Sequence, residues 1–142
     1  MTQLTAEEKR QLICRAQQAR AFAQAPYSRF TVGAALLAAD GRVFTGCNVE
    51  NAAYSPTNCA ERTALFKAVS EGVTQFTHIA VIGGAEGTTS DTVTAPCGVC
   101  RQALYEFCGP ELIVLMARTP DEYVERTLGE LLPFAFGRSN LT

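Results

Sequence analysis

Three features are missing from this chain of 142 residues, and each absence argues against a class of protein. No run of lysines or arginines occurs, and a formal net charge of −2 offers no basic surface to a nucleic-acid backbone or an anionic membrane. No apolar stretch approaches the roughly 18 residues that span a bilayer. The N-terminus has no basic stretch followed by an apolar run, so we expect a cytoplasmic protein that acts on a small, weakly charged molecule.

What the chain does contain favours a globular protein with reduced cysteines. Hydrophobic residues make up 47% and charged residues 18%, which allows a sizeable core. Domains usually hold about 100–200 residues, so we expect one domain over residues 1–142. Six cysteines could form a disulfide framework in a small secreted protein, but in a cytoplasmic chain of this length we expect free thiols.

Hydrophobic periodicity and turn residues predict helices and strands in alternation. Helices are expected at about Ala6–Ala25, Cys59–Glu71, Pro96–Phe107 and Leu128–Phe134, and strands at Val32–Ala39, Val43–Val49, His78–Gly83 and Glu111–Ala117. A capping-box pattern over Thr5–Glu8 marks the start of the first helix. This order predicts an α/β fold, a single three-layer domain with a mixed central sheet and helices on both faces.

The most informative motif has two halves that lie far apart in the chain. They read Cys59-Ala60-Glu61 and Pro96-Cys97-Gly98-Val99-Cys100. Both halves fall at the starts of expected helices, where free N–H groups and the helix dipole favour the thiolate form that binds zinc. Three cysteine ligands leave the fourth corner of a tetrahedral zinc ion free for water, as in a catalytic site. Glu61 follows the first ligand closely and is a candidate to move protons for that water.

A site with three thiolates needs a nearby positive charge. The sulfurs carry a formal −3 against Zn²⁺, which weakens the pull of the ion on water. Arg62 and Arg101 each follow a motif residue and are the two candidates to compensate this charge. We favour Arg62, and both arginines could instead lie on a helix surface.

Two other interpretations of the cysteines remain open. Cys97 and Cys100 could form a thioredoxin-like redox pair, or the zinc could be purely structural, which would require a fourth Cys or His. Glu61 could also stand in a first helical turn for dipole reasons alone. The spare candidates for a fourth ligand resemble ordinary buried thiols and a structural histidine: Cys14, Cys47, Cys108 and His78.

The motifs together resemble those of a known enzyme family. The matching stretches are Pro26–Leu36, Gly46–Tyr54, Cys59–Ala64, Pro96–Gln102 and Glu130–Phe136. They are similar to cytidine deaminases of the small, homotetrameric type, within the cytidine and deoxycytidylate deaminase superfamily, and the likeness runs from about Leu12 to Phe136. It implies a central sheet of about five strands and one zinc ion per subunit. It also implies hydrolytic deamination of cytidine and 2′-deoxycytidine to the uridine products, with release of ammonia, in pyrimidine salvage.

The resemblance further implies roles for particular residues. Cys59, Cys97 and Cys100 would hold the zinc, and Glu61 would be the catalytic proton shuttle. The implied substrate-binding residues are Asn48 and Glu50 on the ribose hydroxyls, Phe30 against the pyrimidine, Ala60, Phe136 from a neighbouring subunit, and Tyr54, which would order that shared wall. We therefore expect a homotetramer whose active sites are completed across subunits.

Departures from the family pattern are few, and rival functions share parts of it. Ala95 stands where Ser or Thr often precedes the Pro-Cys motif. A blasticidin-type deaminase shares the zinc motifs, although Glu50–Tyr54 favours a ribose. A nucleic-acid-editing deaminase fits less well with the acidic charge and with Cys59, where that group usually has His. A zinc-dependent module that binds nucleosides without turning them over also remains possible.

Overall fold

The first helix begins at the capping box that the sequence predicts. In the computed structural model, which describes residues 3–141, the backbone N–H of Glu8 donates to Thr5 Oγ1 (3.1 Å) and that of Thr5 donates to Glu8 Oε1 (2.9 Å). Helix α1 spans Ala6–Arg20, and its predicted end at Ala25 is wrong. Gln24 instead pairs with Val49, and its N–H donates to the carbonyl of Asn48 (2.9 Å). This tertiary pairing overrides the helical preference of an alanine-rich segment.

Five strands form one mixed sheet. They are β1 (Phe30–Ala38), β2 (Val43–Cys47), β3 (Phe76–Ala85), β4 (Ile113–Thr119) and β5 (Glu122–Thr127), in the order β2-β1-β3-β4-β5. The β3–β4 pair is parallel and the other neighbours are antiparallel. The expected fold class and strand number are confirmed, but β5 was not predicted. It is a charged edge strand with no fully buried residue, so it has no clear hydrophobic alternation.

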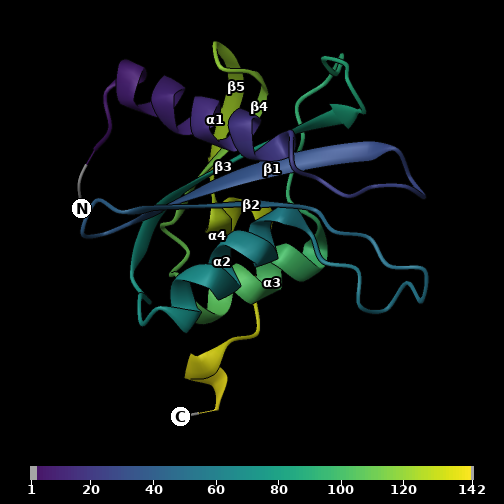
Figure 1. Cartoon of the computed structure of the whole chain (residues 1–142). Coiled ribbons are helices and arrows are strands. Elements are labelled where there is room, and N and C mark those ends of the chain that lie inside the picture. Colours follow the sequence, from purple (N-terminus) through teal and green to yellow (C-terminus); the bar gives the residue numbers. More distant parts are fainter. Residues whose placement is uncertain (1–2, 142) are drawn as a thin grey trace.

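Helices cover both faces of this sheet. Figure 1 shows α1 on one face, and α2 (Ala60–Ser70) and α3 (Gly98–Phe107) side by side on the other. A hydrophobic cluster fills each interface, with Leu12 and Ile13 of α1 on one side and Leu65 and Leu104 on the other. No helix within residues 3–141 is both long and apolar enough to cross a membrane.

Two predicted helix boundaries near prolines are wrong. Helix α3 begins at Gly98 with Cys97 as its N-cap, so Pro96 precedes the helix instead of opening it. Helix α4 covers only Leu128–Leu131 and does not reach Phe134. Leu132 has a non-helical backbone (φ −140°, ψ 68°) because it precedes Pro133, and a proline disfavours the helical conformation in the residue before it.

The start of α2 lies very close to the sheet. A Cβ atom at Gly46 of β2 would lie 2.5 Å from the carbonyl oxygen of Ala60, so only glycine fits there without a shift of the backbone. Helix α3 belongs to the crossover that joins the parallel strands β3 and β4. These two constraints bring the first turns of α2 and α3 together at one end of the sheet (Figure 1).

Candidate active site and metal centre

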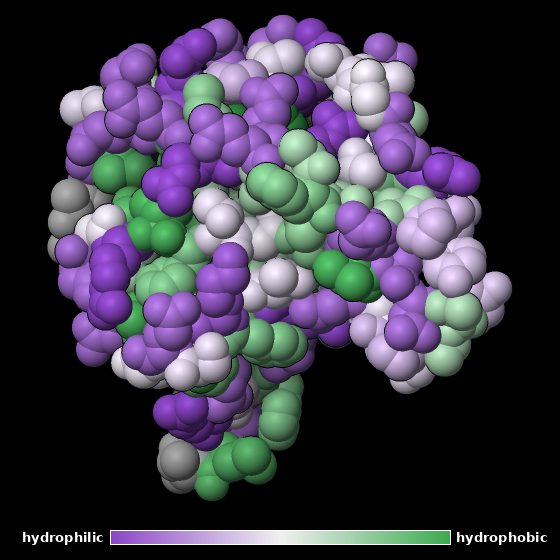
Figure 2. Space-filling view, viewed as in Figure 1, coloured by the Kyte–Doolittle hydropathy of each residue, from purple (hydrophilic) through white to green (hydrophobic). Residues whose placement is uncertain are grey.

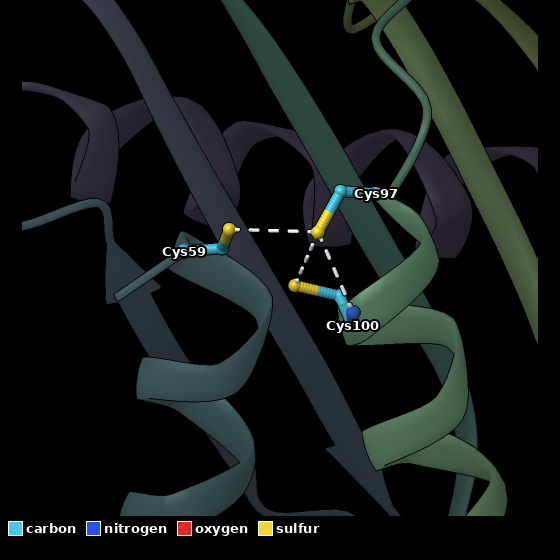
Figure 3. A group of neighbouring side chains, drawn as sticks. All are labelled: Cys59, Cys97 and Cys100. Carbon is cyan, nitrogen blue, oxygen red and sulfur yellow. Dashed lines mark hydrogen bonds between the residues drawn. The ribbon is translucent and has the colours of Figure 1, made fainter. Parts of the chain in front are cut away.

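The three motif cysteines converge from the starts of two helices. Cys59 is the N-cap of α2, and Cys97 is the N-cap of α3, where its sulfur accepts from the N–H of Cys100 (3.5 Å). Figure 3 shows the side chains pointing toward one another. The Cys97 sulfur lies 3.6 Å from that of Cys59 and 3.4 Å from that of Cys100, and all three lie within 4.8 Å of one another.

This sulfur cluster fits one zinc ion. Tetrahedral zinc with Zn–S bonds near 2.3 Å separates its sulfurs by about 3.8 Å, close to the spacing observed here. All six cysteines are free thiols. Within residues 3–141, no further Cys, His, Asp or Glu joins this group. The protein therefore supplies three ligands, which is the number found in catalytic zinc sites and one fewer than a closed structural site requires.

A guanidinium group contacts the cluster. Arg62 Nη2 donates to Cys59 Sγ across 3.3 Å. Burial would lower the pKa of Arg62, but the Cys59 and Cys100 sulfurs outweigh burial and raise it. The Nε of Arg62 is buried and has no hydrogen-bond partner. Among the described residues, it is the one buried side-chain nitrogen or oxygen that lacks such a partner. An arginine held in this way contributes positive charge where sulfurs accumulate negative charge.

The cluster favours the thiolate form at Cys59. Hydrogen bonding with the Cys100 thiol, with smaller contributions from Arg62 and Cys97, lowers the pKa of Cys59 to about 5. The same pairing with Cys59 raises the pKa of Cys100. The cluster therefore favours a thiolate at Cys59, the form of cysteine that binds a soft metal ion.

Glu61 lies beside the sulfurs with its side chain buried. It is 3% exposed and occupies the first turn of α2. Burial raises its pKa to about 7, and the negative charge of Cys59 adds to this effect. A carboxyl group whose pKa lies near the working pH can both accept and release a proton.

The cluster opens into a cavity of about 330 Å³. The cavity is lined by Ser28, Phe30, Val32, Asn48, Glu50, Thr57, Asn58, Cys59, Ala60, Glu61, Thr94, Ala95 and Cys97. This volume is within the range of small-molecule sites, about 300–1,000 Å³. Five predicted substrate or catalytic residues, Phe30, Asn48, Glu50, Ala60 and Glu61, are thus brought together with two of the cysteines.

Asn48 is fixed by the backbone of β1. Its Oδ1 accepts from the N–H of Val32 and its Nδ2 donates to the carbonyl of Phe30, both across 2.8 Å. The side chain is nearly buried, at 9% exposed. Each polar atom of the amide retains one further hydrogen-bonding position. Asn48 therefore has a defined orientation and spare capacity for a ligand.

Glu50 is held by the turn at Tyr27 and Ser28, a contact that no sequence pattern predicts. The backbone N–H groups of Tyr27 and Ser28 both donate to Glu50 Oε1 (3.0 Å each), and the Ser28 hydroxyl donates to Oε2. These bonds hold the pKa of Glu50 below its usual value, and the bond from the Ser28 hydroxyl has the largest effect. Ser28 falls within the Pro26–Leu36 stretch of the family resemblance, so the motif contains it, but only the fold shows its contact with Glu50.

Three other predicted residues lie elsewhere. Tyr54 and Phe136 are largely exposed and do not line the cavity of their own chain. Tyr54 packs edge-on against Tyr27 (ring centroids 6.4 Å apart). Arg101 does not donate to a sulfur in this structure. Its Nε donates to the carbonyl of Pro96 (2.7 Å) and its Nη1 to that of Leu131 (2.8 Å).

The spare thiols and the histidine lie outside the cluster. Cys108 is buried, as expected, and burial raises its pKa to about 12. Cys14 and Cys47 are only half-buried, so their interpretation as buried thiols was partly wrong. His78 is buried in β3, 2% exposed, with its Nδ1 beside Thr77 Oγ1 (2.9 Å).

A cavity that joins a three-cysteine metal site to a buried glutamate, on this three-layer fold, defines a zinc-dependent deaminase. Residues 6–116 match the family model described as "Cytidine and deoxycytidylate deaminase zinc-binding region". The chain belongs to that family, whose resident metal is zinc.

Relatives and solved structures agree with this assignment. The chain is 50% identical over 131 residues to a cytidine deaminase of Sporosarcina psychrophila, which covers 92% of this chain and 93% of the relative. It is 46% identical to a cytidine deaminase of Mycobacterium tuberculosis, over a match that covers 89% of this chain and 87% of the relative. The crystal structure of cytidine deaminase from Burkholderia pseudomallei is similar, with a TM-score of 0.81 and 48% identity over 89% of this chain and 97% of that one.

Proposed function

We propose that this protein catalyses the hydrolytic deamination of cytidine and 2′-deoxycytidine to uridine and 2′-deoxyuridine, with release of ammonia. The observation that carries the proposal is the buried Glu61 beside three converging sulfurs in one cavity. The names of the relatives, and identity of about half the residues with one of them, support the same reaction. In the cell we place this reaction in the cytoplasmic salvage of pyrimidine nucleosides.

Glu61 would handle the protons of the reaction. Cys59, Cys97 and Cys100 would hold zinc, which when bound supplies a water of lowered pKa as the nucleophile. As water adds at C4 of the base, Glu61 would take one of its protons and deliver a proton to N3. Glu61 then assists the transfer of a proton to the amino group, and ammonia leaves as the C4–N bond breaks. Burial of the Glu61 side chain disfavours its charged form, which suits a group that must both accept and release a proton.

Arg62 would keep the cluster reactive. Three thiolates donate much negative charge to a metal ion, and the hydrogen bond from Arg62 to Cys59 withdraws part of it. Arg101 is a weaker candidate for this role, because its guanidinium is engaged with two backbone carbonyls. We assign charge compensation to Arg62.

Asn48 and Glu50 would recognise the sugar. Asn48 retains a spare donor, and the ionised Glu50 retains an acceptor position, so the pair can bind hydroxyl groups of the sugar. Phe30, 42% exposed at the cavity, would pack against the pyrimidine ring, and Ala60 would contribute to the wall of the base pocket. This arrangement favours a nucleoside over a free base.

We further propose a homotetramer in which neighbouring subunits complete each site. Phe134, Phe136 and Leu141 are exposed on the C-terminal segment. This segment projects from the body in Figure 1, and green apolar surface marks it in Figure 2. Phe136 would reach the base in the next subunit, and Tyr54 would order the shared wall. Gel filtration with activity measured across the column tests this proposal, and a fully active monomer would contradict it.

Ultraviolet absorbance tests the reaction itself. Protein incubated separately with cytidine, 2′-deoxycytidine, cytosine and blasticidin S should change the spectra of the two nucleosides only. Turnover of blasticidin S without cytidine would show a blasticidin-type deaminase instead. Binding of cytidine without any spectral change in the zinc-loaded protein would favour a nucleoside-sensing module.

A further inference from the structure

The carboxylate of Glu50 is held by a single short turn, residues 27–29. Two consecutive backbone N–H groups, those of Tyr27 and Ser28, converge on Oε1, and the Ser28 hydroxyl donates to Oε2. Consecutive N–H groups of this kind form an anion-binding concavity. The turn therefore recognises the ionised form of Glu50 and fixes both of its oxygens.

The number of contacts restricts what Glu50 can offer to a ligand. A carboxylate has about four acceptor positions, two on each oxygen. Oε1 accepts two N–H groups and Oε2 accepts one hydroxyl. One acceptor position remains, on Oε2, the same oxygen that Ser28 holds. The orientation of this remaining position thus depends on the Ser28 side chain.

Ser28 is itself fixed by the fold. Its hydroxyl oxygen accepts from the N–H of Phe30 (3.0 Å), so the hydroxyl hydrogen is directed to Glu50. Arg29, between them, adopts a left-handed backbone (φ 59°), which is disfavoured for a residue other than glycine. Two bonds anchor this turn: the N–H of Arg29 donates to the Ala25 carbonyl and the N–H of Glu86 to the Arg29 carbonyl.

We propose that Ser28 is a positioning residue for Glu50, and that its hydroxyl sets the direction of the one acceptor position which Glu50 presents to the sugar. Ser28 also lines the cavity, which places its side chain at the site itself. The backbone N–H groups of the turn hold only Oε1, so without the hydroxyl the carboxylate can rotate about that oxygen. The inference rests on the proposed function, because it requires Glu50 to bind a sugar hydroxyl.

Steady-state kinetics of the zinc-loaded enzyme test this role. Ser28→Ala should lower kcat/KM for cytidine about tenfold, the effect of one hydrogen bond to a charged group. Ser28→Thr retains the hydroxyl and should restore most of the lost efficiency. Ser70→Ala is a matched control, because it removes a hydroxyl that bonds to the Lys67 carbonyl (2.7 Å) away from the cavity. Zinc content should not change in any of these variants, and their thermal midpoints should stay close to that of the wild type, because the backbone bonds of the turn remain.

Sugar discrimination separates positioning from a general structural effect. The probe is 2′,3′-dideoxycytidine, which lacks both ring hydroxyls. The measured ratio is kcat/KM for cytidine divided by kcat/KM for 2′,3′-dideoxycytidine. Ser28→Ala should reduce this ratio severalfold relative to the wild type. It should have little further effect in a Glu50→Gln background.

Three other outcomes would contradict the role of Ser28 or the role of Glu50. An unchanged ratio in Ser28→Ala, with the wild type still preferring cytidine, would overturn the role of Ser28 alone. Fully additive losses in the double variant would also overturn it, since Ser28 would then act independently of Glu50. A wild type that does not distinguish the two nucleosides would instead contradict the sugar role of Glu50, and the inference with it.

Discussion

The guanidinium of Arg62 donates from Nη2 to the sulfur of Cys59 across 3.3 Å. The two residues are separated by one helical turn at the start of α2, so their contact is built into the helix that carries the first candidate metal ligand. The contact places a permanent positive charge against a cluster that has three sulfurs and only a divalent ion to bind.

Arg62→Gln should reduce turnover while the protein keeps its zinc. The substitution removes the positive charge next to Cys59, so the sulfurs donate more negative charge to the metal. We expect kcat to fall about tenfold to a hundredfold, the range of a lost hydrogen bond to a charged group. The measurement is kcat for cytidine, together with zinc per chain by atomic absorption. An unchanged kcat would exclude charge compensation by Arg62.

Arg101→Lys should destabilise the protein more than it affects the chemistry. Lysine keeps the charge but loses the planar fork that spans the carbonyls of Pro96 and Leu131. We expect the free energy of unfolding to fall by about 1–3 kcal/mol, measured by denaturant titration. Wild-type stability with a large loss of kcat would show that this arginine serves catalysis in another way.

Glu61→Gln should retain the metal and lose almost all turnover. Glutamine has nearly the same shape but cannot accept a proton, so we expect kcat to fall by at least about 10²–10⁴. Zinc content and cytidine absorbance are measured on the same sample, with the wild type as the reference. Substantial activity in zinc-loaded Glu61→Gln would refute the role of Glu61 as proton shuttle.

Acid should destabilise the protein through its single histidine. Burial, and the charge of Lys9, hold the pKa of His78 below its ordinary value of 6.5, although Glu125 partly opposes this. The unfolded chain therefore binds a proton that the folded chain resists, and the free energy of unfolding falls as the pH falls below about 6.5. Between pH 7.5 and 5.5 we therefore expect the free energy of unfolding to decrease through this group.

His78→Leu provides the control for that pH dependence. Denaturant titrations of the wild type and the variant at pH 7.5 and 5.5 should show that the free energy of unfolding decreases less in the variant. Zinc release in acid affects both proteins equally, so the difference between them isolates the histidine. Equal losses would mean that His78 does not contribute.

Much of the fold was predictable because local signals and tertiary structure agree. The Thr5–Glu8 capping box fixes the start of α1, and short apolar runs bounded by turn residues identify four of the strands. The sequence does not predict the edge strand β5, because only Tyr123 and Val124 pack partly against the hydrophobic clusters and the other residues of the strand are charged or polar. The early end of α1 depends on pairing between Gln24 and Val49, a contact distant in sequence that no local pattern reveals.

Part of the candidate site was predictable because local sequence motifs mark the cysteines and their neighbouring residues. Two short motifs mark the candidate metal ligands, which the structure places at the starts of α2 and α3. The contact between Arg62 and Cys59 follows from their spacing on one helix, whereas the engagement of Arg101 with Pro96 and Leu131 required the fold. The roles of Tyr54 and Phe136 stay predictions, since both depend on neighbouring subunits.

Removal and return of zinc test the central claim most directly. Protein stripped with a strong chelator under reducing conditions should bind no metal and leave the absorbance of cytidine unchanged. Titration with Zn²⁺ should restore turnover in proportion to the metal bound, up to one ion per chain, and Cys97→Ser should show weakened zinc binding. Full turnover of cytidine by protein shown to contain no metal would contradict the account.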